Sequence, residues 1–167
     1  MGSKQLLWVG LGLIVAIVVI AVASLALTPQ ATNPAFEIAT SFMNAAGTGD
    51  ETTAFPLLNT TMQEWAAANC PDGQASACVQ GYIPAEWGNL IKAVFRRAAT
   101  DGERAWDVEL IATSETDTGA SGVCSYFRVE QEADDVWRIT EWAGFLWCGD
   151  ARSRNMATNA ETPNRVP

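Results

Sequence analysis

An α+β domain behind an N-terminal transmembrane helix is the fold that this sequence predicts, and three observations predict it. The run from Leu6 to Leu27 contains no charged residue. Apolar residues then recur at helical spacing through residues 33–98, and they alternate with polar residues through 104–147. Helices followed by long antiparallel strands are typical of an α+β layer, here about three helices packed on an antiparallel sheet.

The uncharged run is long enough to cross a membrane. As a helix rising about 1.5 Å per residue it spans about 33 Å, slightly more than the hydrocarbon core of a bilayer. Residues 21–23 and 24–26 both resemble cleavage sites of a secretory signal, but such signals have a shorter apolar region, so we favour a retained signal-anchor. Lys4 precedes the run and the next cation is Lys92, which predicts a cytoplasmic N-terminus and an extracytoplasmic domain.

The remaining chain is expected to form one domain. Residues 1–28 are assigned to the N-terminus and the single-pass membrane helix, and residues 29–32 to a linker. Residues 33–150, about 120 in number, have the size of a common domain. Residues 151–167 lack periodicity and large apolar residues, so we expect a disordered tail.

Charge and cysteine content limit the partners and the compartment. A formal charge of −9 and a pI near 4.3 argue against nucleic acid as a partner, because that requires basic surface. Four cysteines in an extracytoplasmic domain predict disulfides. Cys70 and Cys78 flank a turn-rich stretch and are expected to pair, which leaves Cys124 with Cys148. Histidine and CxxC spacing are absent, so we expect no metal site and no cofactor.

Three helical segments are expected before the strands. Asn33 and Pro34 begin the first as N-cap and first helical residue, and Gly47 ends it. The second covers residues 51–68 with an interruption near Pro56, and the cysteine-bearing residues 70–82 read as a loop. The third begins at residue 83 with an apolar stripe at helical spacing: Trp87, Leu90, Ile91, Val94, Phe95 and Ala98.

Three strands are expected at residues 104–114, 121–131 and 137–147. One register of the first two makes a face almost wholly apolar and pairs Asp107 with Arg128 on the other face. Its apolar pairs are Ala112–Val123, Leu110–Ser125, Val108–Phe127 and Trp106–Val129. Continued into the third strand, it predicts the pairs Val129–Ile139, Phe127–Glu141 and Glu130–Arg138.

The second hairpin has two consequences. Tyr126 would lie opposite Trp142 on the outer face, as a cross-strand aromatic pair. Cys124 would lie opposite Gly144, about 13 Å from Cys148 in a flat hairpin. A Cys124–Cys148 bridge therefore requires a bend at residues 143–144; otherwise one of the two cysteines reaches back to residues 70–78.

Glu141 is the candidate catalytic residue, because this register places it on the apolar face. A desolvated carboxylate in a pocket can act as a general acid or base. The alternative is a bulge between Thr140 and Trp142 that turns Glu141 outward. Ser125 shares the apolar face, but a chain without histidine cannot form a Ser–His nucleophile.

The domain resembles the NTF2-like superfamily, specifically small extracytoplasmic members behind one membrane helix. The resemblance rests on NPAFEIATSFMNAAGTGD, ETTAFPLLN and DDVWRITEW. It implies a cone in which helices cover the concave face of a curved sheet and leave a pocket, whose ligand-binding residues here would be Trp106, Phe127 and Ser125. Enzymes of the superfamily commonly use a pocket histidine, and in this chain only Glu141 offers acid–base chemistry.

The leading functional hypothesis is non-catalytic. We expect a membrane-anchored accessory or binding subunit of a membrane-associated complex, held in the cell membrane through Leu6 to Leu27 and joined to a protein partner or to a second copy. The alternative is a small-ligand or isomerase- or lyase-type pocket that uses Glu141. A cone filled by side chains favours the first hypothesis, and an open apolar pocket that contains Glu141 favours the second.

Overall fold

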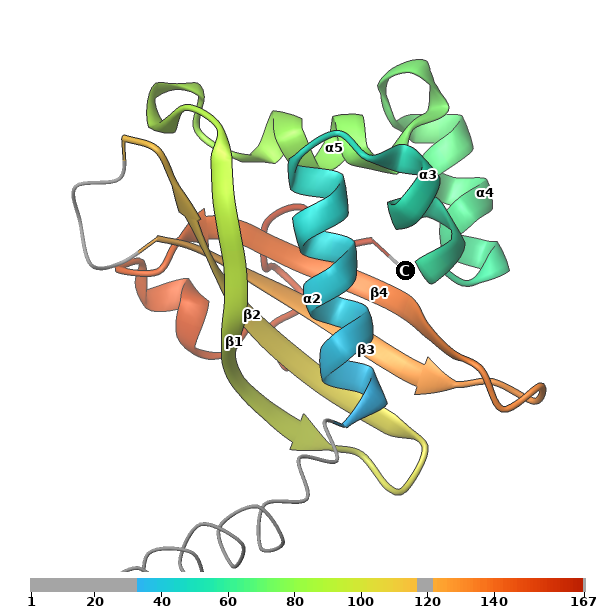
Figure 1. The fold of residues 1–167 in the computed structure, drawn as a ribbon. Coiled ribbons are helices and arrows are strands. Elements are labelled where there is room, and N and C mark those ends of the chain that lie inside the picture. Colours follow the sequence, from blue (N-terminus) through green and yellow to red (C-terminus); the bar gives the residue numbers. More distant parts are fainter. Residues whose placement is uncertain (1–32, 117–121, 167) are drawn as a thin grey trace, which may run out of the picture. The chain divides into compact units, whose positions relative to one another are not determined.

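Residues 33–116 and 122–166, the part of the chain that this computed structural model describes, form helices on one face of a four-stranded sheet (Figure 1). The strands are antiparallel and lie in chain order. They are β1 (Leu90–Thr100), β2 (Ala105–Ser114), β3 (Val123–Gln131) and β4 (Trp137–Trp147). The predicted α+β class is confirmed. The predicted anchor and linker lie outside the described residues, and within these no helix is long and apolar enough to cross a membrane.

Helix α2 (Pro34–Gly47) lies across the sheet and supplies much of the core. It begins as predicted, because the Asn33 side chain accepts a hydrogen bond from the N–H of Ala35 at 3.0 Å. Phe42, in the middle of the helix, is fully buried, and its ring centroid lies 5.6 Å from those of both Phe127 and Trp142. Aromatic contacts of this kind fill the space between helix and sheet.

The shorter helices gather at one end of the sheet (Figure 1). They are α3 (Glu51–Ala54), the 3-10 turn η1 (Phe55–Leu57), α4 (Thr60–Asn69) and α5 (Ala75–Tyr82). The interruption predicted near Pro56 is confirmed, but α5 forms where a loop was expected. Its N-terminus has no local side-chain cap. The carboxylate of Glu51 supplies one by accepting from the N–H groups of Ala75 and Ser76 at 2.9 and 2.8 Å.

The helix predicted from residue 83 is wrong, because residues 90–100 form strand β1. The pairing of β1 with β2 has irregularities at Leu90/Lys92 and at Phe95/Arg97, so Ile91 and Arg96 are extra residues. The residues that face α2 are consequently Leu90, Ala93, Phe95 and Ala98. Their spacing of three, two and three resembles that of a helix more than the strict alternation of a regular strand.

The register predicted for β2 and β3 is confirmed, including the pair Asp107–Arg128. The register predicted for β3 and β4 is half right. Glu130 faces Arg138 as expected, but Phe127 pairs with Trp142 and Arg128 pairs with Glu141. The reason is an irregularity next to Val129 that leaves Thr140 as an extra residue in β4. Trp142 therefore lies in the core, and its predicted pairing with Tyr126 is wrong.

A second irregularity in β4 brings the distant cysteines together. Cys124 lies opposite Leu146 rather than Gly144, because Phe145 is an extra residue. The two bulges together move the strand by two residues, and the Cα atoms of Cys124 and Cys148 are 4.9 Å apart in a disulfide. The second predicted disulfide, Cys70–Cys78, is also present.

Residues 151–166 are folded, so the predicted disordered tail is wrong. The segment contains a 3-10 turn, η4 (Ala151–Arg154), and lies on the sheet face away from α2. Met156 is buried there against Cys124, Tyr126 and Ala143. The N–H of Val166 donates to the carbonyl of Trp142 at 3.0 Å, so the segment also covers the edge of β4. A search for apolar periodicity misses this packing, because it depends on two isolated apolar residues, Met156 and Val166, rather than on a periodic apolar face.

Candidate functional site

Glu141 does not reach the space between helices and sheet. It pairs with Arg128 in the register and forms an ion pair with Arg165 of the C-terminal segment. The side chains of Glu141 and Arg165 are 24% and 21% exposed, so the pair is largely enclosed. The carboxylate therefore already has a partner, and that partner holds residues 151–166 against the sheet.

The predicted ligand-binding residues lie on the other face and contribute to the core. Ser125 and Phe127 are fully buried, and the ring of Phe127 is in edge contact with those of Phe42 and Phe145. Trp106 is partly buried, and its ring centroid lies 5.3 Å from that of Phe36 at the start of α2. The structure thus separates these three residues from Glu141 and packs α2 over the surface they share.

The most buried carboxylate of the outer face is Glu109, which the sequence did not single out. It is 5% exposed and accepts hydrogen bonds from Arg96 at 3.2 Å and from Arg97 at 2.7 and 2.8 Å. The same arginines donate to the carbonyls of Ser153 and Arg154. A buried charge that is paired in this way stabilises the attachment of the C-terminal segment rather than providing a reactive group.

Tyr126 and Arg128 extend the polar network on that face. The Tyr126 hydroxyl donates to Asp107 at 2.6 Å, and burial together with this hydrogen bond raises the pKa of the phenol well above its ordinary value. The hydrogen bond to Asp101 at 2.7 Å is the main cause of a raised pKa for the Arg128 guanidinium. Each charge in this network is therefore neutralised by a neighbour.

An open groove lies elsewhere, around Tyr82 at the end of α5. Two adjoining hollows share Gly81 and Tyr82 and have volumes of about 570 and 350 Å³. The larger is lined by Gly47 and by residues 80–85 and 88–90, and Ala85 is the first residue of the turn η3 (Ala85–Trp87). The smaller is lined also by Trp65, Asn69, Pro71, Ala77 and Cys78. Volumes of this size are usual for ligand sites.

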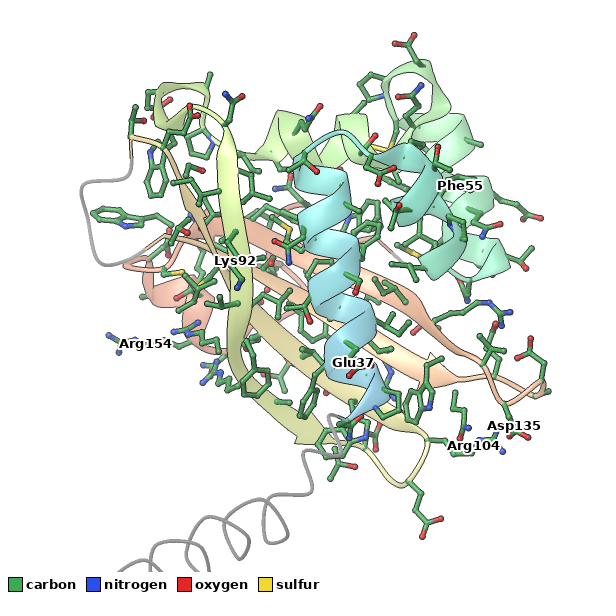
Figure 2. All side chains as sticks on the ribbon, viewed as in Figure 1. Glu37, Phe55, Lys92, Arg104, Asp135 and Arg154 are labelled. Carbon is green, nitrogen blue, oxygen red and sulfur yellow. A yellow bond between two sulfur atoms is a disulfide. The ribbon has the colours of Figure 1, made fainter. Side chains whose placement is uncertain are left out.

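The lining of this groove contains no charged side chain, although the chain carries a net charge of −9. Its polar side chains are the amides of Asn69, Gln80 and Asn89 and the hydroxyl of Tyr82. The opposite end of α2 differs: Glu37, Arg104 and Asp135 lie there, and Arg104 pairs with Asp135 at 3.2 Å (Figure 2). Beside the groove, the carboxylate of Glu115 is bonded to a lining residue, since it accepts a hydrogen bond from the side chain of Asn89 at 3.2 Å.

A buried polar atom lies beside the groove. The indole Nε1 of Trp142 is fully enclosed and, within the described part of the chain, has no partner in hydrogen-bond geometry. Trp142 itself lines neither hollow, and its ring is in edge contact with that of Trp65, with ring centroids 5.7 Å apart. Burial raises the pKa of the Tyr82 hydroxyl above its ordinary value of 10.0, and the nearby Trp142 indole acts in the opposite direction.

Sequence reasoning missed this groove because residues 70–82 were expected to form a loop. The available signal was the aromatic Tyr82 beside Ile83 and Pro84, an apolar group too short to define an element. As to metal ions, residues 33–116 and 122–166 bring together no cluster of three or more histidine, cysteine, aspartate or glutamate side chains.

In comparison with known proteins, no protein-family model, no curated protein and no solved structure matches the chain. The NTF2-like relationship therefore stays a prediction from the quoted motifs.

Proposed function

We propose that this chain is a membrane-tethered, extracytoplasmic binding domain, a non-catalytic accessory subunit that engages its partner through the groove at Tyr82. The observation that carries the proposal is the groove itself, which is open, aromatic and uncharged on a strongly acidic chain. Open depressions that combine aromatic side chains with a few polar groups are typical of binding sites. The NTF2-like architecture, with a filled space between helix and sheet, is the scaffold that we propose for it.

Two disulfides indicate an extracellular domain, because such bonds persist in oxidising compartments. The tether is the uncharged run from Leu6 to Leu27, whose length suits a single membrane crossing. The chain enters the domain at Asn33, the N-cap of α2. Gly47, at the other end of this 14-residue helix, lines the groove about 21 Å away.

The membrane part of the proposal is tested on the full chain in its native membranes. We expect the protein to remain in the pellet after extraction with alkaline carbonate, and its domain to be digested by protease added from the extracytoplasmic side. Release into the supernatant, or protection from the external protease, would contradict the tethered arrangement.

The binding part is tested by photocrosslinking in the same membranes. A photoreactive amino acid replaces Gln80, which is exposed at the groove, and in a control it replaces Val136, which is 45% exposed in the β3–β4 turn. We expect a discrete adduct from position 80 that position 136 does not give and that Tyr82→Ala removes. An adduct of twice the chain mass would identify a second copy as the partner. Equal labelling from both positions would contradict the groove as the binding site.

A further inference from the structure

We infer that the groove at Tyr82 binds a neutral, hydroxyl-rich ligand, a saccharide chain, with one sugar ring against the face of Tyr82. Because this ligand would occupy the same groove, the inference rests on the proposed function and adds the chemical class of what is bound. Three properties of the groove carry it: its uncharged lining, its exposed amides and its aromatic rings.

The uncharged lining disfavours ionic ligands. An ion that leaves water needs a counter-charge or a set of dedicated hydrogen bonds, and the lining residues of both hollows are uncharged. Anions are further disfavoured by the net charge of −9. A neutral ligand needs no counter-charge on this surface.

The polar atoms favour hydroxyl groups over a wholly apolar ligand. The lining carries the hydroxyl of Tyr82 and the amides of Asn69, Gln80 and Asn89. A wholly apolar ligand would cover these groups without pairing them, whereas a hydroxyl can accept from one and donate to another. The amides of Asn69 and Gln80 are exposed at the rim and present both donors and acceptors, which matches neighbouring hydroxyl groups.

The shape of the aromatic residues suits a ring. Tyr82 and Trp65 are both partly exposed and line the smaller hollow together. The C–H face of a pyranose is apolar while its rim carries hydroxyls, so it can lie on an aromatic ring and still satisfy the amides around it. Two exposed glycines, Gly81 and Gly88, leave the backbone accessible in the larger hollow.

A free strand edge is the feature that commonly binds an extended peptide, and parts of both sheet edges of this domain are already occupied. The edge of β4 is covered by Leu58, which bridges to Ile139, and by residues 163–166. At Ala93 the edge of β1 is occupied by the side chain of Asn44. An extended peptide would therefore find these edge positions already occupied.

Calorimetric titration of the full chain, held in phosphatidylcholine nanodiscs free of sugar-based detergent, tests the inference. The probes are the neutral tetrasaccharides cellotetraose, chitotetraose and maltotetraose, and a neutral proline-rich peptide. We expect saturable binding of at least one saccharide, weakened at least about tenfold by Tyr82→Ala and about threefold by Gln80→Ala, whose side chain is exposed. Trp147→Ala, which removes an aromatic ring 56% exposed outside the groove lining, is the matched control and should bind like the original chain.

Absence of saturable binding to all three saccharides at millimolar concentration would overturn the inference, as would binding that neither Tyr82→Ala nor Gln80→Ala weakens. If the peptide binds instead, and Tyr82→Ala weakens it, the saccharide class is wrong while the proposed function stands. If the position-80 crosslink also fails, both fail together. Gln80→Ala keeps the outcome decisive should Tyr82→Ala disturb the packing against Phe145.

Discussion

The side chain of Asn44 hydrogen-bonds both backbone groups of Ala93: the N–H of Ala93 donates to Oδ1 at 2.8 Å, and Nδ2 donates to the carbonyl of Ala93 at 3.3 Å. A neighbouring strand would use the same two groups. Asn44 belongs to α2, whereas Ala93 lies in the edge strand β1, which exposes Ile91, Val94 and Phe95. Without this amide, β1 would present both apolar side chains and free backbone groups, the combination that promotes edge-to-edge association.

Replacing Asn44 by alanine should therefore have two effects. The loss of two part-buried hydrogen bonds should lower the free energy of unfolding by about 1–3 kcal/mol. The opened edge should cause concentration-dependent association, detected by light scattering after size-exclusion chromatography. Asn69→Ala is the control, because Asn69 is an exposed helical asparagine bonded only to the carbonyl of Trp65 in its own helix. Equal behaviour of the two variants would contradict an edge-protecting role for Asn44.

Alanine substitutions at Gly144 and Gly102 separate the energetic cost of backbone strain from the cost of steric crowding. Both have positive φ, +95° and +77°. A Cβ at Gly144 would lie 2.5 Å from the sulfur of Met156, whereas a Cβ at Gly102 meets nothing within 4 Å. We expect Gly102→Ala to cost about 1 kcal/mol and Gly144→Ala about 2–4 kcal/mol in urea unfolding. The double variant Gly144→Ala with Met156→Ala should lose less free energy of unfolding than the sum of the two single variants. Full additivity would show that the two sites do not contact each other.

Arg165 should be the main attachment of the C-terminal segment. It pairs with Glu141, donates to the carbonyls of Met156 and Asn159, and lies over the ring of Tyr126 at 5.4 Å. Arg165→Ala should lower the free energy of unfolding by about 2 kcal/mol and raise amide hydrogen exchange across residues 151–166.

Arg152→Ala is the matched control, since its pairing with Asp150 is local and its side chain is 55% exposed, so we expect at most about 0.5 kcal/mol. A double-mutant cycle of Glu141→Ala with Arg165→Ala should show coupling. Independent effects in that cycle would mean that Glu141 is free for another use.

The two tyrosines should ionise at a higher pH than a free tyrosine does. The pKa of Tyr126 is raised by burial and by its bond to Asp107, and the pKa of Tyr82 is raised by burial. A raised pKa in the folded state means that stability is complete below the unfolded pKa of about 10 and falls as the pH rises beyond it. We expect little tyrosinate absorbance from the native protein at pH 10, where the urea-unfolded chain is about half ionised. Tyr126→Phe should remove more of the alkaline loss of stability than Tyr82→Phe; the reverse order would contradict the assignment.

Local sequence patterns predicted three parts of the fold correctly. The Asn33 cap, the break near Pro56 and the β2–β3 register follow from residues that are close in sequence or directly opposite each other. Helix α5 does not, because its cap is Glu51, 24 residues before Ala75. A contact of this range leaves no periodic signal.

Bulges explain most of the remaining errors. Extra residues at Ile91 and Arg96 gave β1 the spacing of a helix, and an extra Thr140 turned Glu141 away from the core. The outward-turned Glu141 was the alternative that the sequence left open. The groove at Tyr82 was beyond prediction for a different reason, since it exists only where α4, α5 and the start of β1 meet.

The pairing of Val166 with Trp142 sets the order in which the sheet can be completed. During synthesis β1 to β4 emerge and can pair one after another, as in any meander. The outer edge of β4 beside Trp142, however, stays open until residue 166 is also in place, and the apolar surface under Met156 stays open until that residue packs on it. A chain truncated before residue 156 would therefore keep both an open strand edge and an apolar surface, which together favour association.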